Sequence, residues 1–262
     1  MKRRLNRWPS ILYAGFIYAF LYIPIVILIA FSFNQSRLNA VWTGFTFDWY
    51  GALLQNTDVL DATKVSLTVA FISTIASTMI GTLAAVGMYR YHFRGKTALD
   101  GMLYLPIVIP EIVMGISLLA FFATVEIPLG ITTLVIAHIT FSVPFVVVVV
   151  RARLEGFDRS IEEAAMDLGA NEWQTFVRVT LPIIAPGIVA GALLAFTLSI
   201  DDVIISFFVA GPSSTTLPLK IFSMVKFGVT PEINALSTIM LIVTLTIVMI
   251  AERIRMKKEN VS

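Results

Sequence analysis

The chain has 262 residues, of which 57% are hydrophobic and 14% are charged, and its mean hydropathy is +0.86. A soluble domain is about 45–50% apolar and about 25% charged, so this composition argues against a soluble globular protein. The net charge of +2 is too small to indicate a nucleic-acid partner. The absence of cysteine excludes a disulfide framework and a thiolate metal site.

The apolar residues form long continuous runs, which predict an all-α polytopic membrane protein rather than a β-barrel. Crossing a bilayer takes roughly 17–25 residues, and six runs are long enough. The first run follows the basic stretch "MKRRLNR" but is longer than the about 7–15 residues of a signal peptide core, so we expect a retained helix. We predict one domain, residues 1–262, with spans at 11–33, 65–88, 102–124, 129–150, 183–209 and 235–251.

Lysine and arginine alternate between the two sides of the predicted spans. Cytoplasmic loops are enriched in these residues, so the richer side is predicted to be cytoplasmic and to hold both termini. The poorer side has four: Arg37, Lys64, Lys220 and Lys226. The richer side has fifteen: Lys2, Arg3, Arg4, Arg7, Arg90, Arg94, Lys96, Arg151, Arg153, Arg159, Arg178, Arg253, Arg255, Lys257 and Lys258.

The third predicted span contains a carboxylate, Glu111, in "LPIVIPEIVMG". Pro106 and Pro110 free backbone carbonyls beside it, which is tolerated where helices line a cavity. A carboxylate next to exposed carbonyls suits an ammonium group, and the alternative is a role in helix packing. His138 in the fourth span is expected to be a neutral side chain bonded to a neighbouring helix.

The loop at residues 155–182, here called the elbow, reads "DRSIEEAAMDLGANEWQTFVRVTLP" from Asp158. Ser160 and Glu163 have the spacing of a capping box, which predicts a helix from Ile161. Gly169 can end that helix in the left-handed conformation. A second short helix is expected to be capped by Asn171 and Gln174. The apolar faces of both helices fit either packing against the chain's own spans or docking of a soluble partner.

The elbow resembles the "EAA" signature of permease subunits in binding-protein-dependent ABC importers. The matching residues are Glu163, Ala164, Ala165, Gly169, Leu181 and Pro182, with Val179 where isoleucine is usual. The resemblance implies the type I ABC importer permease fold, in which this loop is a coupling helix that sits in a groove of the ATPase subunit. Those six residues would then be the ATPase-coupling positions.

Further stretches are similar to polyamine permeases, and the nearest type is the C subunit of spermidine/putrescine importers. They are "YRYHFRGK", "PEIVMGISLL" and the segment from "FTLSIDDVIIS" to "INALSTI". This resemblance implies a multi-pass protein of the bacterial inner membrane that works with a homologous second permease subunit, two copies of an ATPase subunit and a periplasmic or extracellular polyamine-binding protein. ATP and Mg²⁺ would be bound by the ATPase, and this chain would be no enzyme, with no catalytic residue, cofactor or metal of its own.

The fifth predicted span carries two adjacent aspartates, Asp201 and Asp202, near its outer end. A carboxylate near the bilayer centre is unfavourable by about 2.5–3.5 kcal/mol, and such groups are usually functional. No lysine or arginine lies within the predicted spans to neutralise them. We interpret both aspartates, with Glu111, as a pathway for a cationic amine, the alternative being a bond between helices. Gly187 and Gly191 form a GxxxG that predicts close helix packing.

Four functions compete. The leading hypothesis is the polyamine importer permease that uses alternating access, and the second is an ABC permease for another small solute. A stand-alone secondary transporter would need no elbow, and an intramembrane aspartyl protease needs aspartates on two different helices. The stretch "YRYHFRGKT" ends like a phosphate-binding loop, but Arg90 stands where that motif needs glycine, so we expect ATP hydrolysis in a separate subunit.

Overall fold

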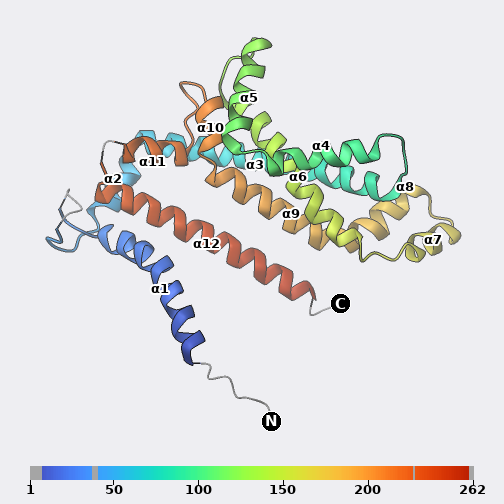
Figure 1. Ribbon diagram of the computed structural model, residues 1–262, viewed down its shortest axis with the longest axis horizontal. Coiled ribbons are helices and arrows are strands. Elements are labelled where there is room, and N and C mark those ends of the chain that lie inside the picture. The colour runs from blue at the N-terminus through green and yellow to red at the C-terminus, as the bar shows by residue number, and fades with distance from the viewer. Residues whose placement is uncertain (1–7, 37–40, 227, 260–262) are drawn as a thin grey trace. The chain divides into compact units, whose positions relative to one another are not determined.

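The computed structural model describes residues 8–36, 41–226 and 228–259, and these are mainly helical (Figure 1). The predicted all-α fold is confirmed. Lys2, Arg3, Arg4, Arg7 and Arg37, which contribute to the predicted charge asymmetry, lie outside the described residues. The helices are α1 Trp8–Phe31, α2 Asp48–Gln55, α3 Thr57–Arg90, α4 Lys96–Val108, α5 Glu111–Thr124, α6 Ile131–Leu154, α7 Ser160–Asp167, α8 Glu172–Thr175, the π-helical segment Phe176–Thr180, α9 Leu181–Asp201, α10 Ile204–Val209, α11 Leu217–Val225 and α12 Pro231–Glu259.

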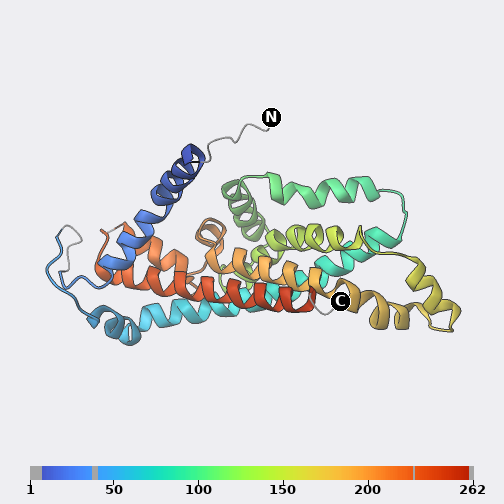
Figure 2. The same cartoon turned by 90° about the horizontal axis from the view of Figure 1, so that it is seen from below.

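Five helices of the described part are long and apolar enough to cross a membrane, and a bent pair brings the number to six. That pair is α4 and α5, which meet at an angle of 110° (Figure 2). The predicted span 102–124 is therefore two helices with a sharp bend between them rather than one continuous helix. The physical reason is Pro110, which has no amide hydrogen and forces the preceding residue, Ile109, into an extended conformation that ends α4.

The predicted fifth span, 183–209, is also interrupted. Helix α9 ends at Asp201, and α10 begins at Ile204 as a separate short helix. Asp202 between them is extended, with a ψ of 126°, and its carboxylate accepts backbone amides from the first turn of α10. Hydropathy stays high across this break, so the apolar pattern alone did not show it.

The chain divides into two compact units, one of Met1–Leu60 with Ile221–Val243 and the other of Asp61–Lys220 with Thr244–Ser262. The first unit contains α1, α2 and the start of α12. The second contains nearly all of α3, all of α4 to α10 and every candidate site residue. The boundaries of the single domain predicted above stay a prediction.

In the second unit α6 and α9 pack along one another, and their shared core is buried and aliphatic (Figure 1). A Cβ atom added to Gly187 would lie 2.8 Å from Arg153 Cβ, and one added to Gly191 would lie 3.3 Å from Val146 Cγ1. The GxxxG therefore allows close helix approach, as predicted. This packing gives a rigid frame between the α9–α10 break and the elbow, which is continuous with α9.

Candidate functional site

The break between α9 and α10 is built around the Asp202 carboxylate. Its two oxygens accept the backbone amides of Ile205 at 3.1 Å and of Ser206 at 2.7 Å, and the Ser206 hydroxyl donates to it at 2.7 Å. The side chain is only 5% exposed. These bonds satisfy amides that a helix start leaves without partners, so Asp202 acts as the N-terminal cap of α10.

His138 of α6 completes this buried polar group. Its Nε2 lies 3.5 Å from Asp202 Oδ2 and 3.2 Å from Ser206 Oγ. Its Nδ1 shares a hydrogen bond of 2.6 Å with Ser199 of α9, and Ser199 is in turn 3.1 Å from Ser73 of α3. His138 is thus bonded to neighbouring helices, as predicted. The network joins four helices at the break.

Asp201 and Glu111 differ from Asp202 because both are exposed. Asp201 is the last residue of α9 and Glu111 is the first residue of α5. Asp201 directly precedes Asp202 in the chain, and Glu111 begins α5, the helix that packs against α10. Helices α5 and α10 pack so closely that a Cβ on Gly115 would lie 2.6 Å from the Phe208 ring. The structure therefore brings the three predicted acids together, one buried and two accessible.

The elbow begins with α7, and its cap is not the one that the sequence spacing predicts. The carboxylate of Asp158 accepts the Ser160 amide at 2.9 Å, so α7 begins at Ser160. Hydrogen bonds from Ser160 hold the pKa of Asp158 below its usual range. The predicted helix start at Ile161 is off by one residue and the predicted capping box does not form, because Asp158 accepts the Ser160 amide that the Glu163 carboxylate was expected to accept.

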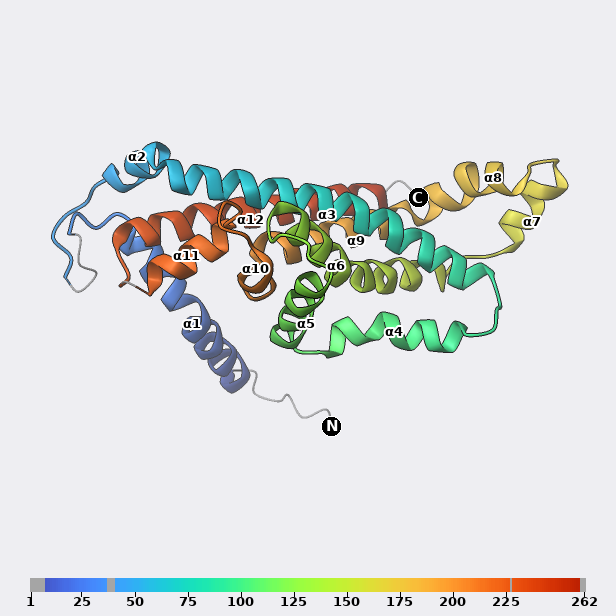
Figure 3. The same cartoon turned by 90° about the horizontal axis from the view of Figure 1, so that it is seen from above.

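The other end of α7 follows the prediction. Gly169 has a φ of +92°, a conformation that glycine adopts without steric strain. Asn171 then caps α8: its side chain accepts the Gln174 amide at 2.8 Å, and Gln174 accepts the Asn171 amide at 3.1 Å. However, α8 is no separate helix, because it runs through Phe176–Thr180 into α9. The α8 part of the elbow is therefore continuous with α9, and α7 lies beside it as a separate helix (Figure 3).

The elbow leaves an apolar surface uncovered. Leu168 is 90% exposed and Trp173 is 71% exposed, while Glu163 and Ala164 of the signature are also exposed and Ala165 is half-buried. An exposed apolar patch of this kind marks an interaction site. The two interpretations of the elbow divide by residue: Phe157 and Phe176 pack on the chain's own helices, Leu168 and Trp173 are uncovered, and docking of a partner stays a prediction.

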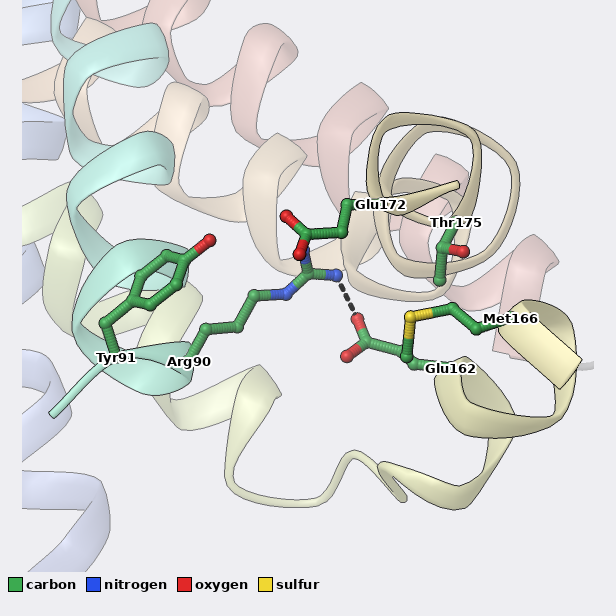
Figure 4. Close-up of a pocket in the computed structure, with 6 residues that line it drawn as sticks. All are labelled: Arg90, Tyr91, Glu162, Met166, Glu172 and Thr175. Atoms are coloured by element: carbon green, nitrogen blue, oxygen red, sulfur yellow. Dashed lines mark hydrogen bonds and ion pairs between the residues drawn. The ribbon is translucent and has the colours of Figure 1, made fainter. Parts of the chain in front are cut away.

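A pocket of about 150 Å³ lies where the elbow meets the end of α3 (Figure 4). Its centre is an ion pair between Arg90 of α3 and Glu162 of α7, neither of which the sequence marked as a site residue. The two lie 72 positions apart, so no local pattern could have paired them. The remaining lining residues are Tyr91, Met166, Glu172 and Thr175.

Residues 77–255 match the model of a protein family described as "Binding-protein-dependent transport system inner membrane component". The chain belongs to this family. The permease is 52% identical over 242 residues to the spermidine/putrescine transport system permease protein PotC of Escherichia coli (strain K12), covering 92% of each chain. It is 46% identical to the putrescine transport system permease protein PotI of the same organism, covering 88% of this chain and 84% of PotI.

A solved structure shows the same fold. A bacterial ABC transporter involved in the import of the polysaccharide alginate contains a chain that matches with a TM-score of 0.75 at 18% identity, covering 96% of both chains. The predicted importer-permease fold is thereby confirmed, and the protein is a multi-pass membrane protein. Membership of the family decides against the secondary transporter and the intramembrane protease.

Proposed function

We propose that this permease is the polyamine-conducting subunit of an ATP-driven importer and moves spermidine or putrescine into the cytoplasm by alternating access. The observation that carries this proposal is the 52% identity to a spermidine/putrescine permease over 92% of both chains. The exposed carboxylates support the same substrate class, because Glu111 and Asp201 are negative groups suited to an elongated cation.

The pathway assignment divides the three acids by their surroundings. Asp201 and Glu111 are accessible, so they are the residues expected to contact the ammonium groups as the substrate passes. The Asp202 carboxylate already accepts hydrogen bonds from two amides of α10 and from the Ser206 hydroxyl. Its contribution is therefore to fix the geometry of the break between α9 and α10. Its negative charge still adds to the attraction of a cation.

The elbow is proposed to dock on an ATPase subunit that binds ATP and Mg²⁺. The exposed signature residues Glu163 and Ala164 and the apolar Leu168 and Trp173 support this role. Ala165, Gly169, Leu181 and Pro182 would shape the contact rather than supply charge. The complete importer would hold a homologous second permease, two ATPase copies and an external polyamine-binding protein, in a bacterial inner membrane with both termini cytoplasmic.

The test is uptake of labelled spermidine, putrescine and sulfate by cells that lack their own polyamine importers and express the full complex. We expect uptake of the two amines and none of sulfate, because sulfate would be repelled by the acids. The control omits only this chain. Sulfate uptake without amine uptake would contradict the assignment of polyamines as the substrate. Amine uptake that persists without this chain would contradict the chain's role as the permease.

A further inference from the structure

The cytoplasmic end of α3 is attached to the elbow by two consecutive residues. Tyr89 donates its hydroxyl to the carbonyl of Phe157 at 3.2 Å. Arg159 donates to the carbonyl of Tyr89 at 2.6 Å and places its guanidinium 4.6 Å from the centre of the Tyr89 ring. The next residue, Arg90, is the member of the ion pair with Glu162. The start of the elbow is therefore held against the end of α3 by these contacts.

Arg90, Glu162 and Thr180 form a closed group of hydrogen bonds. Arg90 Nη2 donates to Glu162 Oε1 and, at 2.8 Å, to Thr180 Oγ1, and Thr180 Oγ1 donates to the same Glu162 oxygen. The Arg90 side chain is 19% exposed and that of Glu162 is 10% exposed, so water screens the pair weakly. The three residues come from α3, α7 and the junction with α9.

The π-helical segment supplies the third member of this group. One π turn inserts an extra residue into the helix, which rotates the residues after it by about 100° relative to a regular α-helix. Its first residue, Phe176, places its ring 5.7 Å from the Arg90 guanidinium, and its last residue, Thr180, bonds to Arg90. Both ends of the π-helical segment therefore contact Arg90. Single π turns within α-helices are frequent at functional sites.

We propose that Arg90, Glu162 and Thr180 form a latch that makes α3 and α9 move with the elbow as one body. This inference rests on the proposed function, because it assumes that an ATPase moves the elbow. The α8 part of the elbow is joined to α9 by a continuous helix, whereas its attachment to α3 is non-covalent and is made by the latch, the Tyr89 contacts and the packing of Phe176 on Arg90. Arg90, Glu162 and Thr180 touch no substrate, so they are positioning residues that convert ATPase motion into movement of the transmembrane helices.

The first test measures polyamine transported per ATP hydrolysed in the reconstituted complex. Glu162→Gln removes the charge of the pair, Thr180→Val removes a hydrogen bond to a charged group, and each is expected to lower this ratio about tenfold. Thr180→Ser keeps the hydroxyl and should restore the ratio. A matched control outside the elbow should leave it unchanged: Asp100→Asn, which breaks the Arg151–Asp100 ion pair between α6 and α4.

The second test needs no substrate. The chain has no cysteine, so spin labels can be placed on Met79→Cys of α3 and Asp167→Cys of the elbow alone. We expect the distance between the labels to be the same with and without bound ATP, and Glu162→Gln to broaden its distribution. A distance that changes with nucleotide while the latch is intact overturns the inference.

An unchanged transport ratio in both latch variants also overturns it, as does a loss of uptake that merely follows the amount of assembled complex. The two proposals fail separately. A complex that hydrolyses ATP but takes up no polyamine contradicts the proposed function, and the spin-label distance still decides whether the latch exists.

Discussion

Two buried carboxylates in the same compact unit are satisfied in opposite ways. Asp202, between α9 and α10, is held by backbone amides and Ser206, with His138 beside it. Glu162, in the elbow, is held by the cation of Arg90 and by Thr180. Their side chains are almost equally buried, at 5% and 10% exposed. Burial alone therefore does not explain the choice of partner.

The difference follows from position in the membrane. Asp202 lies within an apolar run, where an arginine partner would itself be unfavourable, by up to about 2.5–3.5 kcal/mol at the bilayer centre, so a buried acid there is better satisfied by neutral donors. At the end of α3 that meets the elbow, an arginine can reach water during folding, and its pair with Glu162 is stronger than a neutral hydrogen bond. Asp202 thus shapes a fixed break, whereas Glu162 joins elements that must move together.

The largest expected effect comes from removing one partner of the latch. Arg90→Met leaves the Glu162 carboxylate buried without its cation, which is expected to destabilise the complex by about 3–5 kcal/mol. Adding Glu162→Gln to Arg90→Met should recover much of that loss, because no uncompensated charge remains. Thermal unfolding of the purified complex measures both. If the double variant is no more stable than the single one, Glu162 does not depend on Arg90.

Asp202→Ala is expected to cause the next largest loss of stability. It leaves the amides of Ile205 and Ser206 without their acceptor, and an unsatisfied buried group is unfavourable by about 1–3 kcal/mol, so the total should be about 3 kcal/mol. Asp202→Asn keeps one acceptor oxygen and should lose less. The same unfolding measurement applies. Equal losses in the two variants would show that Asp202 stabilises the protein by its charge and not as the cap of α10.

Gly169→Ala should have a smaller effect, confined to the elbow. The φ of +92° strains any residue with a Cβ by about 1–2 kcal/mol, and no atom lies within 4 Å to add a clash. We expect about tenfold weaker binding of the ATPase subunit, measured by titration against the detergent-solubilised permease. Gly101→Ala in α4, also without near neighbours, is the control and should bind normally. Normal binding by Gly169→Ala would exclude the elbow from the contact.

Asn171→Ala is expected to have the smallest effect of these substitutions. It removes the cap of α8, which is worth about 1 kcal/mol, so ATPase binding should weaken about fivefold in the same titration. Asn171→Asp retains the side-chain acceptor and serves as the control. Weaker binding by Asn171→Asp as well would indicate that the amide touches the ATPase directly.

Much of this architecture was predictable because a long apolar run directly indicates a helix long enough to cross a membrane. Five spans and the glycine end of α7 follow from local signals. Three features did not: Pro110 ends a helix that its neighbours favour, Asp202 breaks a run that is apolar on both sides of the two aspartates, and Asp158 accepts the Ser160 amide that the spacing assigns to Glu163. The first break follows from a missing amide hydrogen, and the other two features depend on which acceptor the folded chain brings to an amide.

The candidate site was predictable only in part for a related reason. Ionisable residues in apolar runs are conspicuous, so Glu111, Asp201, Asp202 and His138 could be selected without a structure. Whether each faces solvent or a neighbour depends on helix rotation, which places Asp202 inside and Asp201 outside. The Arg90–Glu162 pair lies in polar segments where charge is ordinary, so nothing in the sequence distinguishes it.

One comparison tests most directly whether the two regions have separate tasks. Asp201→Asn and Glu162→Gln would be placed in the same reconstituted complex, and polyamine uptake and ATP hydrolysis would be measured together over a range of amine concentrations. We predict that Asp201→Asn raises KM for the amine with the transport-to-ATP ratio unchanged, and that Glu162→Gln lowers the ratio with KM unchanged. The same change in both quantities for both variants would contradict the division into a cation pathway and a coupling elbow.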